Sequence, residues 1–91
     1  MASRRKLKKT IHYITSELVT EMYVMSLFKK IEEEKLDNLV DKTINTKDEF
    51  ISRVNHVDGK KDSKIVKSYF RKLRTDWLTA IENLVEEAKA L

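Results

Sequence analysis

The two histidines are the residues of this chain best suited to bind a transition metal or to transfer protons. His12 and His56 each lack a glutamate three residues earlier, so the sequence does not contain the Glu-x-x-His pair of di-iron helical bundles. The His-Glu-x-x-His motif of zinc enzymes does not occur either. With no cysteine in the sequence, thiolate ligands and disulfides are excluded as well. We therefore expect no bound metal and no cofactor.

Pairs of carboxylates one helical turn apart are the next candidates for chemistry. Glu17 with Glu21, and Glu82 with Glu86, have a spacing that could chelate a hard cation, but two carboxylates alone make a weak site. Acid–base catalysis needs a cleft with carboxyl groups in unequal surroundings, and a chain of 91 residues leaves little room for one. Serines and threonines without a positioned base are not nucleophiles. The sequence therefore predicts solvated acids and a protein that is not an enzyme.

Lysine and arginine are distributed unevenly, and this gives the most specific functional signal in the sequence. The net charge is +4, yet residues 1–10 carry +5 and residues 53–74 carry +6, which leaves −7 for the rest of the chain. Clustered cations attract anionic partners. The residues predicted to bind an anion or an acidic partner are Arg4, Arg5, Lys6, Lys8, Lys9, Lys60, Lys61, Lys64, Lys67 and Arg71.

Long amphipathic helices must position these groups, because the chain contains no proline and a single glycine. Apolar residues recur every three or four positions from Leu7 to Phe28, which predicts a first helix from about Ser3, as its N-cap, to Lys30. The lysines at its end would complement the negative pole of the helix dipole. The charge then changes sign abruptly, which places the first turn near Ile31.

The second segment is also helical in pattern and extends to the Asp58-Gly59 turn, since glycine readily adopts the left-handed angles that close a helix. Thr46 and Glu49 have the spacing of a capping box, so a break at Thr46 is an alternative to one continuous helix. Asp62 or Ser63 is expected to cap a third helix that runs to the end of the sequence.

Three helices of similar length joined by short turns predict an all-α, three-helix up-down-up bundle that forms one domain over residues 1–91. Antiparallel alignment places Leu18, Ile44 and Trp77 in the middle layer, so Ile44→Asp should bury an unpaired charge and cost several kcal/mol. The other predicted layers are Leu7 with Val54 and Val66, Ile11 with Ile51 and Phe70, and Met25 or Phe28 with Leu36 and Leu84. This topology also brings the basic segments 4–9 and 60–74 to one end.

The first helix carries more apolar surface than two partner helices normally cover. Val19, Tyr23, Val24 and Leu27 widen its apolar face. This width fits an additional contact surface, such as a dimer interface, and it fits equally a broad core stripe with an amphipathic tyrosine at its edge. The larger aromatic residues that the spacing assigns to the core are Phe50, Phe70 and Trp77.

Three stretches of the sequence carry a resemblance to known proteins. They are Arg4-Arg5-Lys6-Leu7-Lys8-Lys9, Asp48-Glu49-Phe50-Ile51-Ser52-Arg53-Val54-Asn55-His56 and Lys67-Ser68-Tyr69-Phe70-Arg71-Lys72-Leu73-Arg74-Thr75-Asp76. With the glycine turn between the last two, they resemble a group of short, uncharacterised all-helical proteins of Bacteroidota-type bacteria. The resemblance implies a bacterial cytoplasmic helical protein and implies no activity.

Several anionic partners fit a basic end, and they differ in what else they need. An acidic protein, including the acidic end of another copy, is the preferred partner. Nucleic-acid phosphates are the alternative, although the sequence has no helix-turn-helix spacing, RNA-binding signature or aromatic platform for readout. An anionic membrane surface would compete with the core for the apolar face of the first helix. A solvated surface that only aids solubility also stays open.

The sequence also bears on location. It has no run of about 18 apolar residues, so no transmembrane segment is expected, and polar residues interrupt the stretch that would form a secretion signal. We therefore predict a cytoplasmic, non-enzymatic helical protein-interaction module, with homodimerisation and a separate protein partner both open. Nucleic-acid binding through the basic end is the alternative function.

Overall fold

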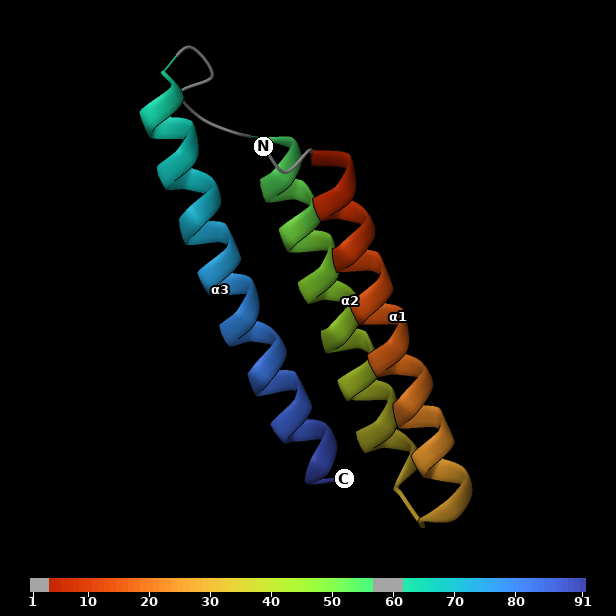
Figure 1. Cartoon of the computed structure of the whole chain (residues 1–91). Helices are drawn as coiled ribbons and strands as arrows, with labels where there is room; N and C mark the ends of the chain where they lie inside the picture. The colour runs from red at the N-terminus through yellow and green to blue at the C-terminus, as the bar shows by residue number, and fades with distance from the viewer. Residues whose placement is uncertain (1–3, 57–61) are drawn as a thin grey trace.

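Three α-helices make up almost all of the chain that this computed structural model describes, which covers residues 4–56 and 62–91. They are α1 (Arg4–Phe28), α2 (Glu33–Asn55) and α3 (Ser63–Lys89). Figure 1 shows α1 and α3 running in the same direction and α2 running antiparallel to both. The predicted all-α, up-down-up arrangement is therefore confirmed, and it forms a rod of 52 × 18 × 15 Å.

The first turn lies where the change of charge sign placed it, but α1 ends earlier than predicted. Its last residue is Phe28, so Lys29 and Lys30 lie beyond the helix and its last turn contains no basic residue. α2 then begins at Glu33, and the acids in its first turn suit the positive pole of its dipole.

Asp62 caps α3 as predicted. Its carboxylate accepts hydrogen bonds from the backbone amides of Lys64 and Ile65, at 2.9 and 3.4 Å, which satisfies two of the free donors of the first turn. The predicted N-cap Ser3 and the Asp58-Gly59 turn fall outside the described residues.

The alternative of a break at Thr46 is wrong, because α2 is continuous through this position. The Thr46 hydroxyl donates to the Lys42 carbonyl at 2.8 Å, within the helix, instead of capping a new helix start. Thr43 and Phe50, one turn to either side, are both buried, so packing holds the backbone helical across the capping-box sequence.

The core consists of two clusters of buried side chains, one in each half of the rod. The cluster nearer the starts of α1 and α3 contains Ile11, Phe50, Val54, Leu73 and Trp77. The other contains Leu18, Met22, Leu36, Leu39, Val40, Leu84 and Ala88. The rings of Phe50 and Trp77 meet edge to face with 5.2 Å between their centroids, which confirms both as core aromatics, whereas Phe70 is only partly buried.

The predicted middle layer is wrong. Leu18 and Trp77 belong to different clusters, and Ile44 leaves 39% of its surface exposed. Its neighbour Thr43 is buried in its place, with 1% exposed. The two positions differ by roughly 100° around the helix. Thr43 can face the core because its hydroxyl donates to the Leu39 carbonyl at 2.8 Å, which leaves no unpaired polar group.

The other predicted core layers are confirmed in part. Leu7, Ile51 and Phe70 pack against the cluster that contains Ile11 and Val54, as the predicted register requires. Leu36 and Leu84 share the other cluster. Phe28 does not join them and is 86% exposed, because α1 ends there and the chain turns away from the core.

The three helices do not pack equally on one another. α1 packs closely on α2, α3 packs on α2, and α1 and α3 approach each other much less closely. Figure 1 shows the same spacing, with α3 set apart from the α1–α2 pair. The long side of the rod between α1 and α3 is therefore the least closely packed, although side chains of both helices meet in the two core clusters. We call it the open side.

Candidate interaction surface

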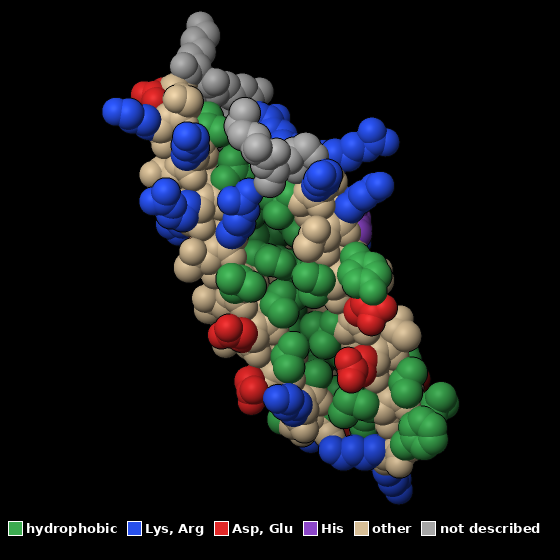
Figure 2. Space-filling view, in the orientation of Figure 1, with side chains coloured by type: hydrophobic (Ala, Val, Ile, Leu, Met, Phe, Trp, Pro, Cys, Tyr) green, Lys and Arg blue, Asp and Glu red, His purple; other side chains and the backbone are tan. Residues whose placement is uncertain are grey.

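The starts of α1 and α3 lie at the same end of the rod, and most of the predicted anion-binding residues lie there. Figure 2 shows lysine and arginine side chains gathered at this end over both helices. We call this the basic end, formed by Arg4, Arg5, Lys6, Lys8 and Lys9 of α1 and Lys64, Lys67 and Arg71 of α3. Lys8 is half-buried and the others are exposed. Lys60 and Lys61 fall outside the described residues.

Few acids neutralise the basic end. Within residues 4–56 and 62–91, no ion pair joins Arg4, Arg5, Lys67 or Arg71 to a carboxylate. Neither α1 nor α3 has an acid in its first turn. The positive pole of the α1 dipole therefore adds to the lysine and arginine charges, whereas the Asp62 carboxylate counters the pole of α3.

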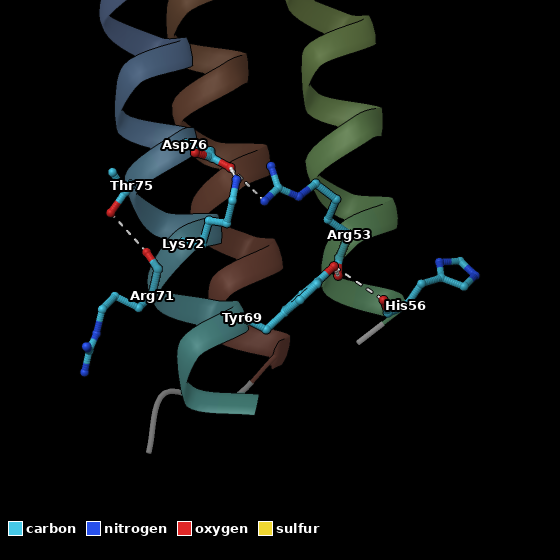
Figure 3. A network of polar contacts seen from close by, with 7 residues as sticks. All are labelled: Arg53, His56, Tyr69, Arg71, Lys72, Thr75 and Asp76. Atoms are coloured by element: carbon cyan, nitrogen blue, oxygen red, sulfur yellow. Dashed lines mark hydrogen bonds and ion pairs between the residues drawn. The ribbon is translucent and has the colours of Figure 1, made fainter. Parts of the chain in front are cut away.

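Asp76 of α3 pairs with two basic residues close to the basic end. Its carboxylate accepts hydrogen bonds from Arg53 of α2 at 2.9 Å and from Lys72 at 3.0 Å, as Figure 3 shows. These two bonds, that of Lys72 first, lower the pKa of the Asp76 carboxyl below its usual range. Arg53 and Lys72 are thus already paired, while Arg71 in the same view points away from the network.

Tyr69 fixes the end of α2 to the first turns of α3. Its hydroxyl donates to the backbone carbonyl of Arg53 at 2.6 Å and lies 3.4 Å from that of His56 (Figure 3). The Arg53 carbonyl belongs to the last turn of α2, and His56 is the C-cap, so neither carbonyl has a further donor within the helix. The Arg53 guanidinium also lies 5.0 Å from the centre of the Phe50 ring. The Tyr69 contacts join α2 to α3 directly below the basic end.

Asp76→Asn is expected to lower the melting temperature at neutral pH and to have no effect in strong acid. A carboxyl whose pKa is lowered by folding contributes stability above its ordinary value of about 4, and this stability is lost as the pH falls through its lowered pKa. Thermal unfolding of both proteins at about pH 7 and about pH 2 measures this. Asp41→Asn, at an exposed position without an ion pair among the described residues, is the control. An Asp76→Asn effect of equal size at both pH values would contradict the role of the charge.

The open side between α1 and α3 is apolar. Figure 2 shows a continuous band of hydrophobic side chains between the two helices, with lysine and arginine on its borders at one end and acids further along. Half-buried residues at helical spacing from Met25 of α1 and Val85 of α3 continue this band, namely Leu7 and Ile14 of α1 and Phe70 and Ile81 of α3. We call this band the open face. Met25 and Val85 also line a hollow between the two helices.

Leu78 is the most exposed apolar residue of α3, with 62% of its surface accessible. It lines a shallow groove with Phe70 and Arg74, next to the open face. The sequence prediction missed it because the core stripe runs through its neighbour Trp77. Its spacing of four residues from Arg74 is the signal that could have found it.

The widened apolar face of α1 divides into two parts. Val19 is half-buried and packs against the core, as a broad core stripe requires. Tyr23, Val24 and Leu27 are exposed, by 47%, 46% and 79%. A second contact surface at this end of α1 remains a prediction for these three residues.

The histidines and the paired glutamates that the sequence singled out lie at the surface. Among the residues that the structure describes, no three histidine, cysteine or acidic side chains are grouped so that they could hold a metal ion. His12 is exposed in the groove that contains Ile44, and His56 Nδ1 lies 2.8 Å from the Ser52 carbonyl. The paired glutamates of α1 and α3 are exposed. Among the described residues, the surface presents an apolar face and cations, such as Arg4 and Arg71, that form no ion pair. Comparisons with protein families, with curated proteins and with solved structures find no match to this chain.

Proposed function

We propose that the chain is a non-enzymatic helical interaction module that binds an acidic amphipathic helix of a protein partner along the open face. The observation that carries the proposal is the apolar side between α1 and α3, which adjoins the basic end. An amphipathic helix binds such a groove through its apolar residues. Carboxylates at the edge of that helix would meet Arg71 and the basic residues of α1.

A protein partner accounts for more of the surface than a nucleic acid does. Phosphates would neutralise the basic end, but they would leave the apolar band along the rest of the rod in water. A helix with leucine-type side chains on one face and acids beside them covers both. Binding of this kind needs no catalytic group, in keeping with a module that is not an enzyme.

The proposal also includes a cytoplasmic location. No helix in the described ranges is both long and apolar enough to cross a membrane. The resemblance to short helical proteins of Bacteroidota-type bacteria supports a bacterial cytoplasmic protein. An acidic protein in that compartment is the partner that the charge distribution favours.

A synthetic helical peptide of three heptads, with leucine at the core positions and glutamate elsewhere, is expected to bind this protein. The affinity of the peptide should decrease when the salt concentration is raised from about 50 to about 200 mM, because exposed charges are screened. Arg71→Glu combined with Arg74→Glu should weaken binding by about tenfold, measured by fluorescence anisotropy.

Two controls make this experiment specific. Lys30→Glu combined with Lys35→Glu changes the net charge by the same amount at exposed positions at the opposite end of the rod, and it should leave the affinity within about twofold. A peptide with lysine in place of glutamate should not bind. Equal binding of the acidic and the basic peptide, or no binding of either, would overturn the proposed function.

Nucleic-acid binding is tested separately, because the exposed cations of the basic end favour it. A gel shift with duplex DNA and with RNA at low and high salt would compare the wild type with a variant in which Arg4, Arg5, Lys8 and Lys9 are all glutamate. If phosphates are the partner, the wild type shifts at low salt and the variant does not, since each lost contact reduces counterion release. Our proposal predicts no specific shift, and a shift that survives physiological salt would replace it.

A further inference from the structure

α3 carries two opposite charges on either side of an exposed leucine. Arg74, Leu78 and Glu82 are spaced by four residues and therefore lie along one face of the helix. All three are exposed, Leu78 by 62%. In the part of the chain that the structure covers, neither Arg74 nor Glu82 forms an ion pair. The face thus presents a cation, an apolar side chain and an anion, in that order.

These two charges cannot pair with each other within one molecule. Arg74 and Glu82 are two helical turns apart, about 12 Å along the axis, with Leu78 between them. The nearest position on this face, one helical turn from Arg74 and one helical turn from Glu82, is occupied by Leu78. Each charge therefore has its complement on the same helix but out of reach.

We propose that the occupant of this face is a second copy of the chain, packed antiparallel so that the two α3 helices cross at Leu78. Reversal of direction about Leu78 places Arg74 opposite Glu82 of the second copy, and Glu82 opposite its Arg74. The two-fold axis thus produces two Arg74–Glu82 ion pairs in each dimer, as in an isologous dimer. A parallel arrangement would place Arg74 against Arg74, which electrostatic complementarity excludes.

The apolar residues beside this face extend the contact. Phe70 lines the groove shared by Arg74 and Leu78, and Ile81 and Val85 line the next groove along α3 with Glu82. All three are half-buried in the single chain. Together with Leu78 they would form the apolar part of the contact.

The antiparallel arrangement also fits the charge distribution of the whole chain. α1 has no acid before Glu17, and it carries Glu17 and Glu21 further along. Two copies in opposite directions therefore place the basic end of each beside the acidic half of the other. This inference goes beyond the proposed function, because it concerns the exposed side of α3 next to the open face.

Charge reversal tests the pairing without disturbing the core, because the residues involved are exposed. The wild type is expected to have twice the chain mass of 10.8 kDa in light scattering after size exclusion. Arg74→Glu alone and Glu82→Arg alone each create two like-charge contacts and should raise the dimer dissociation constant by about tenfold or more. The double variant with both substitutions should dimerise again, since the ion pairs are restored in reverse.

Mixing provides a second and independent readout. In an equimolar mixture of the Arg74→Glu protein and the Glu82→Arg protein, one chain supplies two acids and the other supplies two bases, so the mixed dimer is expected to form. Lys35→Glu, an equal charge change on α2, should leave the wild-type dimer intact. Unchanged far-UV circular dichroism shows that each variant is folded.

The outcomes separate this inference from the proposed function. A wild type that stays monomeric at all concentrations, or a double variant and a mixture that both stay monomeric, would overturn the antiparallel dimer. If the acidic heptad peptide still binds such a monomer, the interaction module stands with a different partner. If neither the peptide nor a second copy binds, both proposals fall.

Discussion

Thr43→Asp is expected to destabilise the bundle by about 3 kcal/mol or more, because it moves a carboxylate from water into the core. Thr43 is 1% exposed, and its hydroxyl hydrogen is used within α2 by the bond to the Leu39 carbonyl. Aspartate has no hydrogen to donate when it is charged, and its second oxygen would have no donor. Chemical denaturation followed by circular dichroism measures the loss.

Ile44→Asp is the matched comparison, because it introduces the same charge one residue further along the same helix. Ile44 is 39% exposed, so the new carboxylate reaches water and the cost should be about 1 kcal/mol. Thr43→Val should also be mild, since it removes the donor and keeps the shape. A larger loss for Ile44→Asp than for Thr43→Asp would show that Ile44 faces the core and would restore the predicted middle layer.

Trp77→Ala is the second substitution with a large expected effect. Trp77 is 5% exposed and makes the edge-to-face contact with Phe50 in the cluster nearer the basic end. Its removal leaves a cavity and should cost about 3–5 kcal/mol. In a chain of this length each kcal/mol lowers the melting temperature by roughly 4–8 °C, so the variant should melt at least 12 °C lower. Thermal unfolding measures the shift.

Leu27→Ala provides the control for this effect. Leu27 is 79% exposed, so its truncation should change the free energy of unfolding by only about 0.5 kcal/mol. Equal losses for Trp77→Ala and Leu27→Ala would mean that the Phe50–Trp77 contact does not stabilise the core.

The helices and their order follow from the sequence, because apolar residues spaced by three or four positions are a local signal. What this signal cannot settle is which of two adjacent residues faces the neighbouring helix. Both Thr43 and Ile44 lie near the apolar stripe, and hydrophobicity alone selects the isoleucine. The hydrogen bond within α2 makes the threonine acceptable in the core, and such a bond depends on the folded backbone.

The capping box at Thr46 is a second case in which the local sequence signal does not decide the structure. The spacing of Thr46 and Glu49 is correct for a helix start, but buried residues on both sides favour one continuous helix. The N-cap contributes about 1 kcal/mol, which is smaller than the free energy gained by burying the Phe50 side chain. Tertiary packing therefore overrides the local motif.

For the candidate surface, the sequence indicated the location of the charges but not their partners. The antiparallel topology was sufficient to bring residues 4–9 and the start of α3 to one end. That Asp76 pairs with Arg53 of α2 depends on the distance between the two helices, which no spacing along the chain reveals. The open face likewise results from how far α3 stands from α1.

Isoleucine methyl NMR on titration with the acidic heptad peptide tests the proposed use of the open face most directly. Ile14 and Ile81 lie on the open face, whereas Ile44 lies in the groove on the other side of α1. We predict that the methyl signals of Ile14 and Ile81 shift and that the signal of Ile44 does not. Shifts confined to Ile44, or no shift at saturating peptide, would contradict the open face as the binding surface.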